Sequence, residues 1–172
     1  MITKLICRFW LNPMQLAFLM SLTLLLGAYS FQYIGGMTPC DLCWPQRYAH
    51  FSILAITTLG LLLHKAGRKV QMIFTSLTLL AIGYSVAMSG YHTGVEQKWW
   101  QGPTTCTGNG EQSADLDNLF DNMMSANLVR CDEIPWEMFG ISMAGYNFII
   151  SVLVFGFVAC ALISGLRKRE AS

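Results

Sequence analysis

The chain contains a Cys-x-x-Cys pair, Cys40 and Cys43, whose spacing suits either thiol–disulfide exchange or a metal site. Arg47 follows Cys43 by four residues and His50 by seven, so these side chains share one face of a helix that begins near Cys43. A cysteine at a helix N-terminus lies at the positive end of the helix dipole, which favours its thiolate. The sequence therefore predicts a reactive thiol pair with a fixed positive charge beside it.

Two further cysteines, Cys106 and Cys131, lie far along the chain in a long polar segment. Together with Cys40 and Cys43 they allow three disulfide pairings. We expect an oxidised protein to join Cys40 to Cys43 and Cys106 to Cys131. The first bridge closes a very small ring and adds little loop-closure stabilisation, so its expected use is chemical.

The cysteines alone leave other interpretations open. Structural disulfides in an exported loop would suit a membrane scaffold without catalysis. A four-thiolate zinc site has compatible residue types, but Cys106 and Cys131 lack the Cys-x-x-Cys spacing of such sites, and no metal is expected. Cys7 and Cys160 are interpreted as small buried apolar residues.

The composition predicts an integral membrane protein. Hydrophobic residues make up 53% of the chain and charged residues only 12%, whereas soluble domains carry roughly 25% charged residues. An apolar helix of roughly 20 residues matches the hydrocarbon core of a bilayer. Four segments are expected to form such helices: 14–34, 45–63, 70–91 and 145–166. The predicted fold is an all-α, four-helix transmembrane bundle that forms a single domain over residues 1–172.

The distribution of charge predicts the orientation of this bundle. Eight of the eleven basic residues lie at the two termini and in the turn between the second and third spans. Cytoplasmic segments are enriched in such residues, so both termini are expected in the cytoplasm. Loops 35–44 and 93–144, which contain the four candidate redox cysteines, then lie on the outer side.

The long outer loop is expected to lie along the membrane surface. Its residues 114–129 carry apolar side chains at helical spacing with an acidic opposite face, which predicts a short amphipathic helix. Ser113 is a plausible N-cap for it. Trp99, Trp100 and Trp136 flank the helix, as is typical of aromatic residues at a bilayer interface.

These features together resemble the DsbB family of inner-membrane, disulfide-forming quinone reductases, over essentially the whole chain. The motifs that carry the resemblance are Pro39-Cys40-Asp41-Leu42-Cys43 with Arg47, Tyr91-His92-Thr93, and Cys131 followed by Trp136 and Phe139-Gly140. The related vitamin K epoxide reductase family places its loop cysteines before the Cys-x-x-Cys pair, which is the reverse of the order here.

The resemblance implies a thiol:quinone oxidoreductase with Cys40, Cys43, Cys106 and Cys131 as its catalytic residues. A DsbA-type thioredoxin-fold oxidase is the implied partner, and it would form a mixed disulfide with Cys106. Cys131 would then pass the electrons to the Cys40–Cys43 pair. Each step would be the attack of a thiolate on a disulfide sulfur.

The resemblance also implies the electron acceptor and the location. The acceptor is a membrane quinone, with ubiquinone expected ahead of menaquinone and with Arg47 and His92 near its ring. The implied location is the bacterial inner membrane, as a multi-pass protein in the lipid bilayer with its active cysteines facing the periplasm. No contact with nucleic acid is expected.

Overall fold

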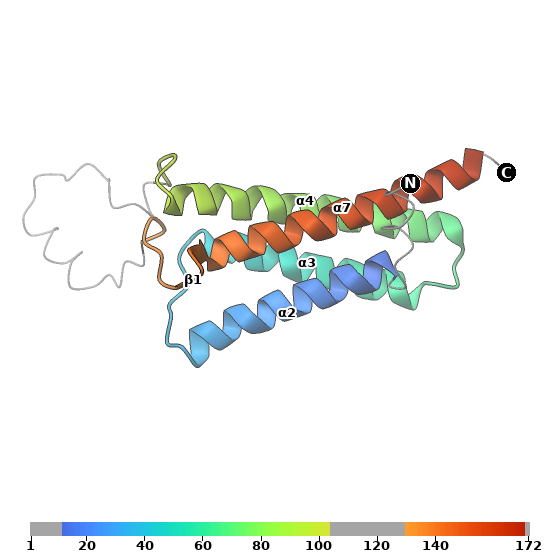
Figure 1. Cartoon of the computed structure of the whole chain (residues 1–172). Helices are drawn as coiled ribbons and strands as arrows, with labels where there is room; N and C mark the ends of the chain where they lie inside the picture. The colour runs from blue at the N-terminus through green and yellow to red at the C-terminus, as the bar shows by residue number, and fades with distance from the viewer. Residues whose placement is uncertain (1–11, 104–129, 171–172) are drawn as a thin grey trace, which may run out of the picture.

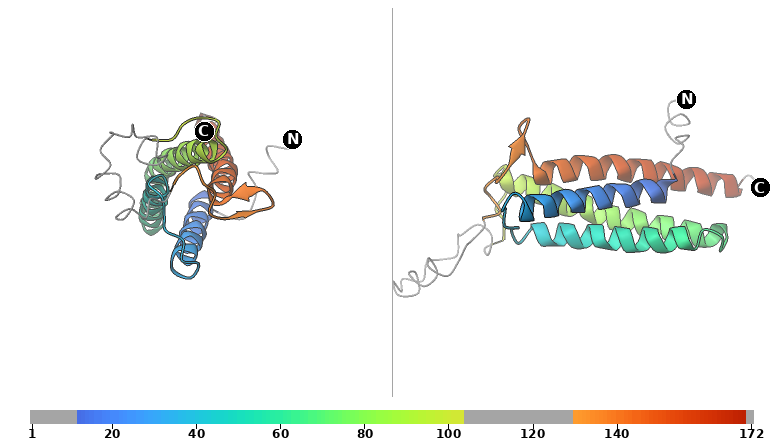
Figure 2. Two further views of the ribbon diagram at one scale, coloured as in Figure 1. Left: turned by 90° about the vertical axis from the view of Figure 1, so that its left-hand side faces the viewer. Right: turned by 90° about the horizontal axis from the view of Figure 1, so that it is seen from below.

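Four helices and one small hairpin make up the part of the chain that the computed structural model describes, residues 12–103 and 130–170. In chain order they are α2 (Pro13–Tyr33), α3 (Cys43–Leu62), α4 (Arg68–Glu96), β1 (Glu137–Met138), β2 (Ile141–Ser142) and α7 (Met143–Glu170). The helices run side by side along one axis (Figures 1 and 2). The predicted all-α membrane bundle is confirmed.

Three of these four helices are long and apolar enough to cross a membrane: α2, α4 and the Met143–Arg167 part of α7. Helix α3 is not among them, because its first turns carry the polar side chains of Gln46, Arg47 and His50. It packs against both α2 and α4. Helix α3 therefore holds these polar side chains against neighbouring helices.

The helix boundaries follow local signals. Asn12 caps α2 by accepting a hydrogen bond from the backbone N–H of Met14 at 3.1 Å, and Pro13 occupies the first turn, where its missing N–H costs nothing. Gly67, with φ of 99°, precedes α4. Helix α4 continues to Glu96, beyond the expected end near Tyr91, so His92 lies inside the helix rather than at its edge.

The core is built from all four helices. Its fully or almost fully buried members are Ala17, Met20, Ile53, Ile82, Val154 and Val158. Several hydroxyl groups lie within this apolar bundle, and those of Thr57, Thr78 and Ser89 each donate to the carbonyl oxygen four residues earlier. Among the described residues, every buried side-chain nitrogen or oxygen has a hydrogen-bond partner.

The end of the bundle on the left in Figure 1 gathers the segments that surround the cysteine pair. The hairpin turns at Phe139 and Gly140, whose φ values of 55° and 75° are typical of a two-residue hairpin turn. Just before the hairpin, Trp136 packs on Phe31 of α2 with ring centroids 4.9 Å apart. The predicted helix over 114–129, Ser113, Cys106 and Cys7 lie outside the described residues.

A substitution at Gly60 would test how closely α3 packs against its neighbours. A Cβ atom at this position would lie 2.6 Å from the Met14 sulfur and 3.0 Å from the Phe74 Cβ. We expect Gly60→Ala to destabilise the bundle by about 1 kcal/mol or more, since overpacking outweighs the gain in helix propensity. Gly156→Ala is the matched control, because nothing lies within 4 Å of its added Cβ. Thermal unfolding in detergent measures both, and equal midpoints would contradict the described packing.

Candidate functional site

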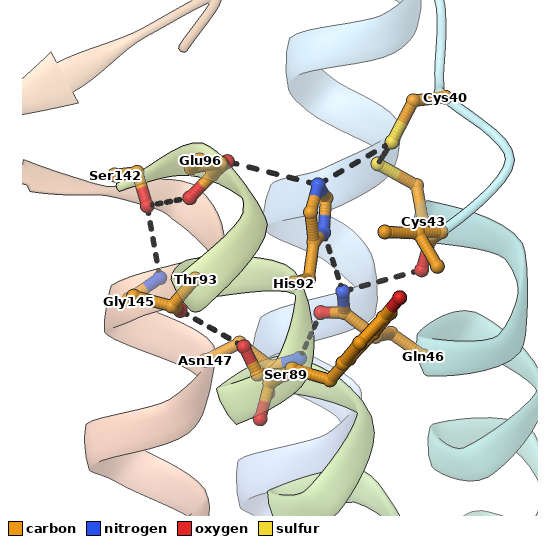
Figure 3. Close-up of polar contacts among 12 residues, drawn as sticks. Cys40, Cys43, Gln46, Ser89, His92, Thr93, Glu96, Ser142, Gly145 and Asn147 are labelled. Atoms are coloured by element: carbon orange, nitrogen blue, oxygen red, sulfur yellow. Dashed lines mark hydrogen bonds and ion pairs between the residues drawn. The ribbon is translucent and has the colours of Figure 1, made fainter. Parts of the chain in front are cut away.

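Cys40 and Cys43 lie together at the start of α3. Cys40 precedes the helix, Cys43 is its first residue, and their Sγ atoms are 2.8 Å apart as two thiols (Figure 3). The backbone N–H of Cys43 also donates to the Cys40 carbonyl at 3.0 Å, which closes a tight turn. The hydrogen bond with Cys43, followed by burial, raises the pKa of the Cys40 thiol. This raised pKa favours the protonated thiol of Cys40.

His92 approaches this pair from α4. Its Nε2 atom lies 3.6 Å from the Cys40 sulfur, and its Nδ1 atom lies 2.7 Å from Nε2 of Gln46 (Figure 3). The Gln46 side chain also contacts Asn147 of α7 at 2.7 Å. His92 and Gln46 are both buried, so the thiol pair rests on a polar cluster contributed by three helices.

Glu96 closes the other side of His92. Its Oε1 atom is 3.8 Å from His92 Nε2, and its second oxygen accepts a hydrogen bond from Ser142 at the end of β2. Ser142 in turn accepts from the backbone N–H of Gly145 at 3.1 Å. The hairpin and the first turn of α7 are thus attached to the end of α4 at the level of the cysteines.

Cys131 reaches the same region from the segment that precedes β1. It is 1% exposed and belongs to one buried apolar cluster with Cys40, Leu42 and Val95. Cys131 is disulfide-bonded. Its predicted partner Cys106 lies outside the described residues, so the Cys106–Cys131 pairing stays a prediction.

Charged residues on both sides of Cys131 fix its local backbone. Arg130 makes a two-pronged ion pair with Asp132, at 2.9 and 3.1 Å, and a further contact with Glu133 at 3.4 Å. The hydrogen bonds from Arg130 lower the pKa of Asp132. The pair is solvent-exposed on the Arg130 side, so it contributes orientation more than stability.

A cavity of about 500 Å³ opens beside the thiol pair. Both cysteines, Arg47 and His92 line it. Most of the remaining wall is apolar and comes from α2, α7 and the segments 37–39 and 130–138. This size and this mixture of apolar wall with a few polar groups are typical of sites for small organic ligands.

Arg47 is the buried basic residue of this wall, which also contains Glu96, Arg130 and Glu133. Arg47 donates to the Gln32 amide oxygen at 2.5 Å and lies over the rings of Tyr29 and Trp44 at 4.8 and 5.3 Å. Among the described residues no carboxylate lies within ion-pair distance of Arg47. A cation stabilised by aromatic faces and an amide keeps its capacity to bind an electronegative group in the cavity.

The arrangement can exchange electrons through sulfur, and the cavity beside it has room for a small, mostly apolar ligand. Cys40, Cys43 and His92 also bring three potential metal ligands within 4.8 Å of one another. Gln46, Asn147 and Glu96 were not predicted as site residues. Their signal was present, since each is a polar side chain within or beside an apolar span, where such residues are costly unless paired.

Comparison with known proteins gives a consistent result. A family model described as "Disulfide bond formation protein DsbB" matches residues 12–161. A protein named disulfide bond formation protein B from Aromatoleum aromaticum is 28% identical, over 83% of this chain and 84% of that protein. A protein of the same name from Paracidovorax citrulli is also 28% identical, over 74% of this chain and 72% of that protein. An uncharacterised protein of Rickettsia prowazekii is 26% identical, over 83% and 81%.

The raised pKa of Cys40 yields a test on the reduced protein. Cys43→Ala removes the hydrogen bond that contributes most to this shift, so the pKa of Cys40 should fall. Alkylation of Cys40 by iodoacetamide at fixed pH should then be faster, by about tenfold for each pKa unit. Mass spectrometry of the Cys40 peptide measures the rate, with Cys160→Ala as the control. An unchanged rate in Cys43→Ala would rule out the described thiol–thiol hydrogen bond.

Proposed function

Because the chain belongs to the DsbB family of disulfide bond formation proteins, we propose that it is a thiol:quinone oxidoreductase that reoxidises a DsbA-type partner. Membership of this family supports a role in disulfide bond formation by a membrane protein. The quinone as electron acceptor and the DsbA-type protein as partner are what we propose in addition. The observation that carries it is the cavity whose wall contains the thiol pair and Arg47.

The electrons enter at the outer cysteines. A thiolate of the reduced partner attacks Cys106, forms a mixed disulfide with it and releases Cys131 as a thiolate. Cys131 then attacks Cys40, which forms a Cys40–Cys131 bond and leaves the electron pair on Cys43. The location of Cys131 in one buried cluster with Cys40 supports this step, because exchange needs the sulfurs to come into contact.

The electrons leave through Cys43. This residue begins α3, where the positive end of the helix dipole favours negative charge on its sulfur, and it lines the cavity. Before the electrons leave, the second thiol of the partner displaces Cys106, and the Cys106 thiolate attacks Cys131, which restores the Cys106–Cys131 disulfide and releases Cys40. The Cys40–Cys43 dithiol would then give two electrons and two protons to a bound quinone, and Cys40 and Cys43 would return to the disulfide. Arg47 would donate to a quinone carbonyl oxygen, which becomes more negative as the ring is reduced. His92 lines the same wall at the level of the sulfurs.

The proposed function also specifies the orientation of the protein in the membrane and the electron acceptor. The basic termini and the basic turn before α4 favour a cytoplasmic location for that end, so the cysteines face the periplasm of the inner membrane. Disulfides persist on that side. The apolar wall suits a lipid-soluble quinone, ubiquinone ahead of menaquinone.

The cysteine relay predicts a sharp division among cysteine variants. Serine in place of Cys40, Cys43, Cys106 or Cys131 should abolish steady-state oxidation of a reduced DsbA-type protein. Cys7→Ser and Cys160→Ser should keep full turnover, since neither belongs to the relay. The assay follows quinone absorbance in anaerobic detergent solution. Full activity in any of the first four variants would disprove the relay.

The proposed role of Arg47 predicts that its substitution weakens the binding of the quinone. Arg47→Gln removes a charged donor from the cavity wall, so the apparent KM for the quinone should rise roughly tenfold or more. Arg68→Gln is the matched control, because Arg68 binds the Gly165 carbonyl at the other end of the bundle. The KM for the protein partner should stay unchanged in both. An unaltered quinone KM in Arg47→Gln would remove Arg47 from the site.

A further inference from the structure

Three residues from three helices form a directed chain of hydrogen bonds that ends at the thiol pair. Gln46 Nε2 donates to the carbonyl oxygen of Leu42 at 3.2 Å and lies 2.7 Å from His92 Nδ1. Asn147 Nδ2 donates to Gln46 Oε1 at 2.7 Å. All three residues are at most 8% exposed.

The direction of each bond follows from the groups at its ends. The Leu42 carbonyl can only accept, so it requires the NH₂ group of Gln46 on its side. At the other end, Asn147 Oδ1 accepts from Ser151 and contacts His50 Nε2 at 3.0 Å, which turns the Asn147 NH₂ group toward Gln46. The Gln46 amide is thus held in one orientation from both sides.

This orientation determines which nitrogen of His92 carries the proton. The second N–H of the Gln46 amide points at His92 Nδ1, which must therefore accept. A neutral imidazole that accepts at Nδ1 is protonated at Nε2. The Nε2–H group then lies between the Cys40 sulfur at 3.6 Å and the Glu96 carboxylate at 3.8 Å.

We infer that Gln46, held by Asn147, is a positioning residue that keeps His92 in the Nε2-protonated tautomer, so that His92 donates to the Cys40 sulfur when that sulfur is negative. The inference rests on the proposed function for its role in turnover. Cys40 carries negative charge twice in the relay. It is the leaving group when a thiolate attacks Cys131 of the Cys40–Cys131 bond, and it is the nucleophile when the bond to Cys43 forms again.

The same tautomer argues against a metal site at Cys40, Cys43 and His92. A metal ligand must offer a lone pair, and the nitrogen nearest the sulfurs carries a proton instead. Binding through His92 Nε2 would require the Gln46 and Asn147 amides both to reverse, against the Leu42 carbonyl and Ser151. The cluster is therefore built for hydrogen bonding to sulfur.

The tautomer can be measured directly on the full-length protein. Histidine labelled with ¹⁵N in the ring gives distinct nitrogen shifts and couplings for the two tautomers, and the chain has only three histidines. The His92 signals are assigned by their loss in His92→Gln. In the reduced protein in micelles at neutral pH, we expect an unprotonated Nδ1 and a protonated Nε2. The opposite tautomer, or an average of the two, would overturn the inference.

Variants then test what sets the tautomer. Gln46→Met preserves size but removes the donor, so the His92 signals should shift toward a mixture. Resolution of the Cys40–Cys131 bond should slow by about tenfold or more, as for a lost hydrogen bond to a charged group. Gln71→Met is the matched control, since Gln71 bridges Gly60 and Leu63 far from the cysteines. It should change neither readout.

A second variant keeps the inference testable if Gln46→Met does not fold. Asn147→Leu removes the bond that orients Gln46 and should move the His92 signals in the same direction. Unchanged His92 signals in both folded variants would overturn the assignment. If the tautomer responds as expected but the wild-type protein reduces no quinone, the proposed function fails while the positioning of His92 stands.

Discussion

The structure depends on the pairing of polar groups inside an apolar bundle. A buried amide, imidazole or carboxylate without a partner costs several kcal/mol in a medium that offers no water. In the described part of the chain this requirement is met completely. It is met by contacts between helices, such as those that join Gln46 of α3, His92 of α4 and Asn147 of α7. The apolar core holds the helices together, and the polar cluster fixes how they face one another at the cysteines.

The polar cluster gives the two sulfurs different surroundings. Cys40 lies outside α3, is buried, and faces His92 and the cluster that contains Cys131. Cys43 begins α3 and, like Cys40, lines the cavity that Arg47 also lines. In the proposed relay, electrons reach the pair through the bond between Cys131 and Cys40, and they leave it from Cys43 to the quinone. Thiol–disulfide exchange is sensitive to such differences, because about 30 mV corresponds to roughly 1.4 kcal/mol for a two-electron couple.

The bundle was predictable because its signals are local. Uninterrupted apolar segments predict α2 and α7 to within a few residues, and Pro13, Gly67 and their neighbours mark the starts of helices. The polar cluster was not predictable in the same way. Gln46 and Asn147 are 101 residues apart, and their contact depends on the rotation of each helix about its axis, which a single sequence does not determine. The extension of α4 to Glu96 was missed because residues 92–96 are mostly polar and lack the apolar run that defines a span.

In the proposed function, the Cys40–Cys43 dithiol at the wall of the cavity is the immediate electron donor to a quinone. The most direct measurement is an anaerobic single-turnover titration of two fully reduced double variants, followed by quinone absorbance. The variant with serine at positions 106 and 131 keeps the dithiol and should reduce one equivalent of ubiquinone. The variant with serine at positions 40 and 43 keeps only the outer cysteines and should reduce none. Quinone reduction by the second variant, or none by the first, would contradict the account.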